Sequence, residues 1–417
     1  MRELARSGAT GRHALRQGSR RLLASGGLVN AGLATSSVFV SLFFYVASGS
    51  IAEMALYSIG RYGGLIVMSS VVVRVFPNTS PRRLFRVGLI LSSAFYGALI
   101  VLGRSAGELA APLGLFNGAA LGTYWFGANT LAYDVLAPEE RGHYYGWNFA
   151  LMSVLNVVMP LTAGLVIARV GGTAGYIAVF AIALASFVAA FISARGLADT
   201  RSIGGVSLRY ALSFPFQRAE WGRMWIALTL RGFKQAAGGI GLIVLVALAT
   251  HSSRAQGEFA AIASLAGVGT SILAGRITTA RRSAGMWIGA IGFTAATLLL
   301  FVRIDFAMLL AYGFLSGLIY PTLMVPLASV VLETIADDPC AAELRGGYVL
   351  SREIAANIGR LIAVGLLLVL LAATSPTQAV LAVLSIAALL QLVVAHLGAQ
   401  LGTPVELGRA PIPATSK

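Results

Sequence analysis

Long, unbroken runs of apolar residues recur along the chain, and short polar segments separate them. A helix needs about 20 mostly apolar residues to cross the hydrocarbon core of a membrane. The runs are continuous rather than alternating, so they predict helices and not the strands of a membrane barrel. Twelve segments qualify as spans: 24–48, 51–74, 85–103, 111–133, 146–168, 174–194, 223–250, 257–275, 284–302, 305–333, 346–372 and 377–397.

The composition supports a membrane protein. Of the 417 residues, 57% are hydrophobic and 11% are charged, whereas about a quarter of the residues in a soluble domain are charged. Cys340 is the single cysteine and the four histidines are scattered, so neither an internal disulfide nor a metal site is expected. The sequence has no ATP-binding motif and no nucleophile–base constellation. We therefore expect no cofactor and no enzyme activity.

The net charge of +15 is unevenly distributed. Most Lys and Arg residues outside the predicted spans lie on the side that holds both termini. Because cytoplasmic loops are enriched in these residues, we expect both termini in the cytoplasm and the protein in the cell (plasma or inner) membrane. This placement accounts for the positive charge without a nucleic acid. The run after Leu22 is too long for the apolar part of a secretory signal, so we interpret it as the first span.

The two halves of the chain share short matching segments at corresponding places. The matches are PRR at 81–83 with ARR at 280–282, GLFNG at 114–118 with GFLSG at 313–317, Asp134 with Glu333, and RGHY at 141–144 with RGGY at 345–348. They predict an all-α integral membrane protein of two six-helix bundles, related by a pseudo-two-fold axis along the membrane normal. The predicted parts are 1–194 (basic cytoplasmic tail and first bundle), 195–222 (cytoplasmic central loop) and 223–417 (second bundle and short cytoplasmic tail).

Paired basic residues follow the second span of each half, and this arrangement resembles the major facilitator superfamily of secondary transporters. The family's loop motif is Gly-x-x-x-Asp-Arg/Lys-x-Gly-Arg/Lys-Arg/Lys. Arg82 and Arg83 match its last two positions, whereas Asn78 stands in place of the Asp and Pro81 in place of the second Gly. In the second half Arg281 and Arg282 match, and Ala280 replaces the Gly. The resemblance implies a twelve-helix transporter that alternates access to a small-molecule substrate.

The resemblance also implies a gate at the cytoplasmic ends of the spans. In this chain, pairing of the loop arginines with acidic residues would take the place of the missing Asp. Arg82 and Arg83 would face Asp134, and Arg281 and Arg282 would face Glu333. The predicted gating residues are Arg82, Arg83, Asp134, Arg141, Arg281, Arg282, Glu333 and Arg345. The alternative is that these arginines only anchor the cytoplasmic side.

Charged residues inside the predicted spans need an explanation, because a central Arg, Lys or Asp costs about 2.5 to 3.5 kcal/mol on insertion scales. In the eleventh span, Glu353, Asn357 and Arg360 recur at helical spacing and form one polar stripe, whereas Arg352 is expected to point about 100° away. Arg61 in the second span lies near the midplane.

The seventh span carries a second polar cluster. Arg231, Lys234 and Gln235 have i, i+3, i+4 spacing and are expected on one helix face. Like charges at this spacing repel, so we expect an anionic group nearby.

Two interpretations of these embedded charges stay open. In the first interpretation, the embedded charges line a central cavity that has a surplus of positive charge. Such a cavity favours an anionic solute, because a guanidinium binds carboxylate or phosphate in a bidentate fork. Alternatively, they form ion pairs that only hold the halves together. The predicted substrate-binding residues are Arg61, Tyr124, Trp125, Asn129, Arg231, Lys234, Gln235, Asn357 and Arg360. Tyr124 and Trp125 have helix packing as their alternative role.

Glu353 is the predicted proton-coupling residue. A carboxyl group in a low-dielectric site holds a proton more readily, and a nearby arginine opposes this, so substrate arrival could change the balance. The alternative is that Glu353 is a permanently ionised partner of Arg360 or Arg352.

The sequence therefore predicts a monomeric, proton-coupled secondary transporter for a small amphiphilic or anionic solute in a lipid bilayer. The lack of a sugar-type polar motif favours export over uptake. A lipid or glycolipid flippase and a non-transporting membrane scaffold are the alternatives. A flippase predicts cations along a lateral opening, and a scaffold predicts that no solute crosses the membrane.

Overall fold

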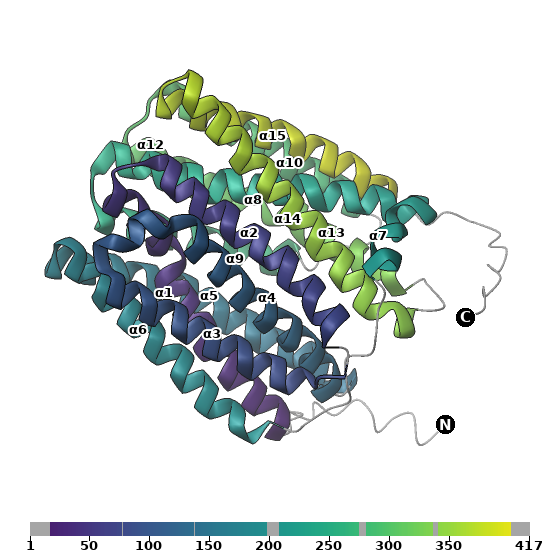
Figure 1. The fold of residues 1–417 in the computed structure, drawn as a ribbon. Helices are drawn as coiled ribbons and strands as arrows, with labels where there is room; N and C mark the ends of the chain where they lie inside the picture. The colour runs from purple at the N-terminus through teal and green to yellow at the C-terminus, as the bar shows by residue number, and fades with distance from the viewer. Residues whose placement is uncertain are drawn as a thin grey trace, which may run out of the picture.

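A computed structural model describes residues 17–76, 78–136, 138–197, 208–274, 281–336 and 341–401. The described residues form helices joined by short turns, without a strand (Figure 1). The helices are α1 Gln17–Ser48, α2 Ile51–Val75, α3 Pro81–Leu102, α4 Ala110–Val135, α5 Pro138–Val170, α6 Gly172–Ser193, α7 Leu208–Gln217, α8 Ala219–Thr250, α9 Ser253–Ala274, α10 Arg282–Thr297, α11 Leu299–Val302, α12 Phe306–Ile319, α13 Pro321–Ala336, α14 Ala341–Ala373 and α15 Pro376–Leu401, with 3-10 turns η1 Gly103–Leu109 and η2 Ala194–Gly196.

The predicted spans are present among the described residues. In the part of the chain that the structure describes, eleven helical segments are long and apolar enough to cross a membrane. One of them, Pro81–Ala132, contains two helices, α3 and α4, that η1 separates. The twelve predicted spans therefore each correspond to a helix or a helix pair, and the chain is a multi-pass membrane protein.

Local sequence signals explain several helix ends. Pro81 occupies the first turn of α3, and the Ser80 hydroxyl accepts a hydrogen bond from the backbone N–H of Arg83, as an N-cap residue does. Asp305 caps α12 in the same way, with its carboxylate accepting from the Met308 N–H at 2.8 Å. The tenth span is broken at Tyr320, and Pro321 begins α13 because a proline lacks the N–H that would continue the helix.

The central segment differs from the prediction. Residues 195–222 were expected to form a loop, but they contain α7 and the first turn of α8. The side chain of Phe214 in α7 is fully buried against Trp221 and Tyr348. Burial of Phe214 therefore anchors this short helix, whereas Leu212 and Phe216 of the same helix are exposed.

The helices pack in two groups with corresponding contacts. In the first group α2 packs on α4, α1 on α5 and α6, and α3 on α4 and α6. In the second group α9 packs on α12, α8 on α14 and α15, and α10 on α13 and α15. Counted as spans, each pair in one half has its equivalent in the other, as a duplicated six-helix unit requires.

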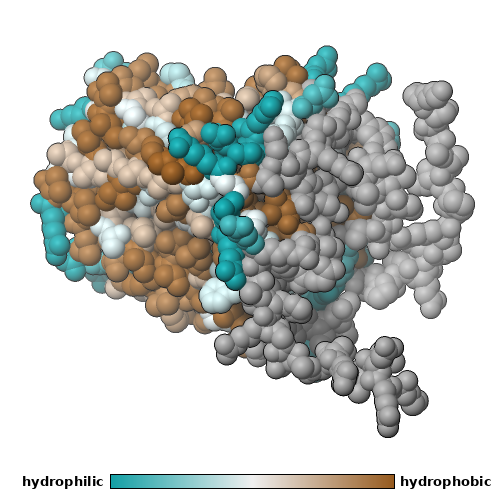
Figure 2. Space-filling view, turned by 90° about the horizontal axis from the view of Figure 1, so that it is seen from below, coloured by the Kyte–Doolittle hydropathy of each residue, from teal (hydrophilic) through white to brown (hydrophobic). Residues whose placement is uncertain are grey.

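The two halves meet through two main contacts, α5 with α9 and α2 with α14. Figure 1 shows the early helices mainly in the lower part of the view and the later ones mainly in the upper part. Buried phenylalanine and tyrosine side chains fill the interior, whereas Leu265, Ile288, Val302 and Val369 are exposed. Figure 2 shows one face on which hydrophobic side chains predominate, as expected of a surface that faces lipid.

Candidate functional site

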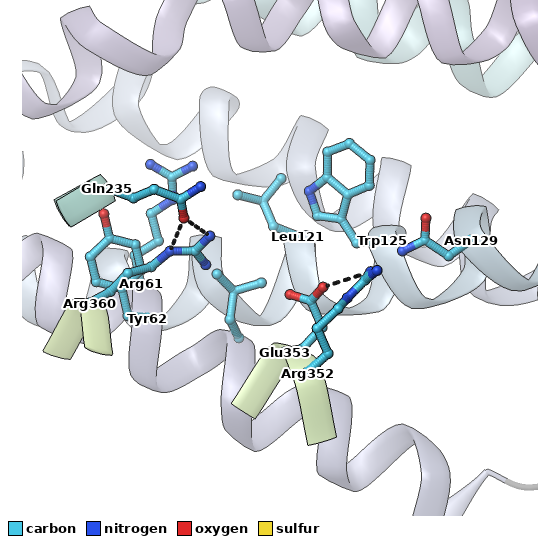
Figure 3. A pocket seen from close by; sticks show the side chains of 10 residues that line it. Arg61, Tyr62, Leu121, Trp125, Asn129, Gln235, Arg352, Glu353 and Arg360 are labelled. Atoms are coloured by element: carbon cyan, nitrogen blue, oxygen red, sulfur yellow. Dashed lines mark hydrogen bonds and ion pairs between the residues drawn. The ribbon is translucent and has the colours of Figure 1, made fainter. Parts of the chain in front are cut away.

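A cavity of about 490 Å³ lies between the two halves. Its volume is in the range of small-molecule sites. Four helices supply its lining: α2, α4, α8 and α14 (Figure 3). The lining residues are Arg61, Tyr62, Leu65, Leu121, Trp125, Asn129, Gln235, Arg352, Glu353 and Arg360. Each half therefore contributes to the wall.

Arg360 is fixed at one end of the cavity by neutral partners. Its Nε and Nη2 atoms donate hydrogen bonds to Gln235 Oε1 at 3.2 and 2.7 Å, and Nη1 donates to Asn357 Oδ1 at 2.7 Å. Its guanidinium carbon lies 5.6 Å from the centre of the Tyr62 ring. None of these partners is an acid, so these contacts orient the positive charge without neutralising it.

Close helix packing brings Arg360 and Gln235 together. A Cβ atom at Gly359 of α14 would clash with the carbonyl oxygen of Thr229 in α8, and one at Gly232 would clash with that of Ala356. The two backbones can approach this closely only because both positions are glycine.

Arg61 reaches the same end of the cavity from the other half, as Figure 3 shows. A Cβ atom at Gly118 of α4 would clash with its carbonyl oxygen, so α2 and α4 also pack backbone to backbone. The Arg61 Nε atom is buried, and within the described part of the chain it has no hydrogen-bond partner. The cavity end near Arg61 and Arg360 therefore carries two positive charges from opposite halves.

Glu353 lies at the other end of the cavity and pairs with Arg352. Arg352 Nη2 is 3.3 Å from Glu353 Oε1, and both side chains are 33% exposed. The expectation that Arg352 would point away from the polar stripe is wrong, because its side chain lines the cavity beside Glu353 (Figure 3). Of the two arginines considered as partners for Glu353, the structure pairs it with Arg352.

Trp125 and Asn129 line the cavity as predicted from the sequence, whereas two other predicted residues lie behind its wall. Tyr124 is 2% exposed and packs against the Phe85 ring with centroids 5.1 Å apart. Asn357 is 1% exposed; it donates to the Glu353 carbonyl oxygen at 2.9 Å and accepts from Arg360. Asn357 is therefore a positioning residue for Arg360.

Two further predicted residues, Arg231 and Lys234, are not among the lining residues. Lys234 Nζ lies 3.5 Å from the centre of the Tyr320 ring and 4.7 Å from that of Phe293, within the second half. The expected anionic neighbour is missing from the described residues, since neither cation makes an ion pair there. Consecutive residues are 100° apart on a helix, so Gln235 faces the cavity while Lys234 faces these rings.

No protein-family model matches the sequence. The chain is 26% identical over 344 residues to the uncharacterized protein YqgE of Bacillus subtilis (strain 168), covering 82% of this chain and 80% of that protein. A match to an uncharacterized protein in the sodM 3′ region of Geobacillus stearothermophilus is also 26% identical, over 171 residues, 41% of this chain and 80% of that protein.

Several solved structures of transporters resemble this one. A bacterial homologue of the iron transporter ferroportin, in an inward-facing state, has a TM-score of 0.66 at 15% identity, covering 94% of this chain and 100% of that chain. A POT family transporter in complex with 5-aminolevulinic acid has a TM-score of 0.67 at 10% identity, covering 94% and 98%. A D-xylose–proton symporter has a TM-score of 0.64 at 13% identity, covering 89% and 96%. The chain has the major facilitator superfamily fold.

The predicted gating residues whose side chains the structure describes lie near the ends of α3, α10 and α13. Arg282 donates to both carboxylate oxygens of Glu333 at 2.7 Å. Arg82 Nη2 donates to the carbonyl oxygen of Arg195 at 2.8 Å, and Arg83 and Arg281 are exposed. The side chains of Asp134, Arg141 and Arg345 lie outside the described part of the structure. The ion pair of the second half is thus present, and its role as a gate stays a prediction.

The sequence did not single out Tyr62, Leu65 or Leu121, which complete the cavity wall. Leucine in an apolar span carries no signal that separates a cavity wall from a lipid-facing surface. Tyr62 directly follows Arg61, and an aromatic beside an embedded arginine is a signal that could have identified it.

Proposed function

We propose that the protein is a secondary active transporter that moves an anionic or amphiphilic organic solute by alternating access. The observation that carries this proposal is the cavity between the two halves, to which both halves contribute polar side chains. Rocking of one half against the other would open such a cavity to each side in turn. The resemblance to solved transporters for a sugar, a nucleoside and peptides supports a small-molecule cargo.

The charge of the cavity supports an anionic cargo. Three arginines and one glutamate line it, so it carries a surplus of positive charge. Burying charges without compensation is costly. A carboxylate or phosphate group on the cargo would supply the compensation, and arginine is well suited to bind either group.

We also propose that Glu353 couples transport to protons, that both termini lie in the cytoplasm and that the transporter exports its cargo as a monomer. Glu353 is the acidic residue of the described cavity wall. Its ion pair with Arg352 uses the Oε1 atom, so the other carboxylate oxygen can take a proton or a ligand. The distribution of Lys and Arg along the sequence supports the orientation.

The test is transport by the purified protein in liposomes with an imposed pH gradient, using a panel of organic anions and neutral solutes. We expect the wild type to concentrate at least one organic anion against its gradient. Glu353→Gln is expected to equilibrate that anion without concentrating it. Glu258→Gln, which removes a carboxylate from the surface pair with Arg254, is the control and should behave as the wild type.

Two outcomes would contradict the proposal. Concentration of the anion by Glu353→Gln would remove this residue as the coupling acid. Absence of flux for every solute would contradict transport itself, and scrambling of a labelled lipid in the same liposomes would then favour a flippase.

A further inference from the structure

The polar groups of the cavity are divided between two ends. Arg61, Tyr62, Gln235 and Arg360 lie at one end, and Arg352 and Glu353 lie at the other with Trp125 and Asn129 (Figure 3). Glu353 and Arg360 are seven residues apart on α14, which corresponds to about 10 Å along the helix. Leu121 lies between these two ends (Figure 3).

The two ends differ in their balance of charge. Arg352 and Glu353 neutralise each other. Arg61 and Arg360 have no acidic partner among the described residues, and the hydrogen bonds of Arg360 go to amide oxygens. The first end therefore carries a charge of +2 for which the described residues provide no ion pair.

The guanidinium group of Arg360 is preorganised to bind an oxyanion. Its three hydrogen bonds to Gln235 and Asn357 fix the plane of the guanidinium and use three of its roughly five N–H groups. The remaining N–H groups are available to a ligand. Because Arg61 approaches from the other half, one compact group could accept hydrogen bonds from both arginines.

We propose, building on the transport function above, that the cargo is an organic phosphate monoester. Its dianionic phosphate group binds between Arg61 and Arg360, and its organic part extends past Leu121 to pack on Trp125. A phosphate monoester carries a charge of about −1.5 to −2 at neutral pH, which balances the two arginines and leaves the Arg352–Glu353 pair intact. A monoanion or a zwitterion leaves positive charge uncompensated.

Phenyl phosphate and phenyl sulfate are a matched pair of probes. They have nearly the same shape, but the sulfate ester is a monoanion. Binding is measured at pH 7.5 as thermal stabilisation of the purified protein in detergent. A second measurement is inhibition, in liposomes, of the transport of a solute identified in the panel above. We expect phenyl phosphate to bind at least about tenfold more tightly than phenyl sulfate. Methyl phosphate, which lacks the ring, should bind more weakly than phenyl phosphate.

Substitutions of the two arginines test whether the preference for phenyl phosphate arises at their end of the cavity. Arg61→Gln and Arg360→Gln are each expected to abolish the preference for phosphate over sulfate. Arg303→Gln is the matched control, because Arg303 is 76% exposed and pairs with Asp305 at the surface. If either glutamine variant unfolds in detergent, the same arginine is replaced by lysine instead. Lysine keeps the positive charge, so this variant should retain part of the preference for phenyl phosphate over phenyl sulfate.

The proposal fails if phenyl phosphate and phenyl sulfate bind equally, or if both glutamine variants keep the preference. Tighter binding of dicarboxylates such as glutarate and suberate would also overturn it, since the second acidic group would then compete for Arg352. The transport function survives each of these results if another solute is moved in a manner that depends on Glu353.

Discussion

At the scale of single residues, Lys234 is a half-buried cation whose ammonium group lies against aromatic rings. Its Nζ lies 3.5 Å from the centre of the Tyr320 ring, and a desolvated cation–π contact contributes about 2 kcal/mol. A double-mutant cycle of Lys234→Met and Tyr320→Leu, measured by thermal unfolding in detergent, should therefore give a coupling of this size.

A matched cycle supplies the control for this prediction. This cycle combines Lys234→Met with Tyr312→Leu. Tyr312 is a buried tyrosine of the same half, and no contact between it and Lys234 is found among the described residues. The effects of these two substitutions on stability should therefore be additive. Equal coupling in the two cycles would mean that Lys234 has no specific contact with Tyr320.

The individual cavity residues could be predicted only in part. Helical spacing and the cost of embedded charge pointed to Arg61, Gln235, Glu353 and Arg360, and the structure brings these four to one cavity. Spacing gives the direction of a Cβ atom but not the path of a long side chain. The prediction for Arg352 was wrong for this reason.

At the scale of helices, close backbone approach determines where the cavity arginines lie. Gly359 of α14 lies against the Thr229 carbonyl oxygen of α8, so Gly359→Ala forces the two helices apart. Overpacking of this kind costs about 1 to 3 kcal/mol. We expect this variant to unfold at a lower temperature. Moving the two helices apart would also disturb the Gln235–Arg360 contact, so we expect weaker solute binding.

Gly365→Ala on the same helix is the control. A Cβ atom at Gly365 meets no atom within 4 Å, and alanine is the better helix former. This variant should be as stable as the wild type or slightly more stable. If Gly359→Ala is equally harmless, α8 and α14 are less tightly packed than the structure indicates.

The existence of the spans was predictable, whereas their irregularities were not. Hydropathy over about 20 residues identifies a span because every residue contributes. The break at Tyr320 and the 3-10 turn η1 depend on one or two residues and on neighbouring helices. Helix α7 forms because Phe214 finds an apolar site against Trp221 and Tyr348, a tertiary contact that the local sequence does not reveal.

At the scale of the whole molecule, contacts between the halves lie on both sides of the cavity. Val72 and Val73 of α2 pack with Leu350 and Ile354 of α14 in a buried cluster toward the end that holds the start of α1. Toward the opposite end, α5 packs on α9. Alternating access requires that each contact opens in one of the two states, so the contact between α5 and α9 should separate during transport.

A disulfide across this contact tests that requirement. A Cβ atom at Gly164 of α5 would lie 3.3 Å from the Arg254 Cα atom of α9, so the two Cα atoms are within reach of a disulfide. The same Cβ atom would lie 2.8 Å from the Ser253 carbonyl oxygen, so Gly164→Cys alone is the control for the effect of the added side chain on packing. In a Cys340→Ser background, Gly164→Cys with Arg254→Cys should transport when reduced and stop when oxidised. Reductant should restore transport, measured with any solute identified in the liposome panel.

A second pair of cysteines keeps the cross-link within one half. A Cβ atom at Gly122 of α4 would lie 3.4 Å from the Met68 Cβ atom of α2, close to the Cβ separation of a disulfide. Gly122→Cys with Met68→Cys should therefore transport equally well when oxidised and when reduced. Loss of transport only with the pair that joins the halves would attribute the arrest to relative motion of the bundles. Full transport by the oxidised inter-half pair would mean that this contact stays closed throughout the cycle, and rocking about the cavity would then be excluded.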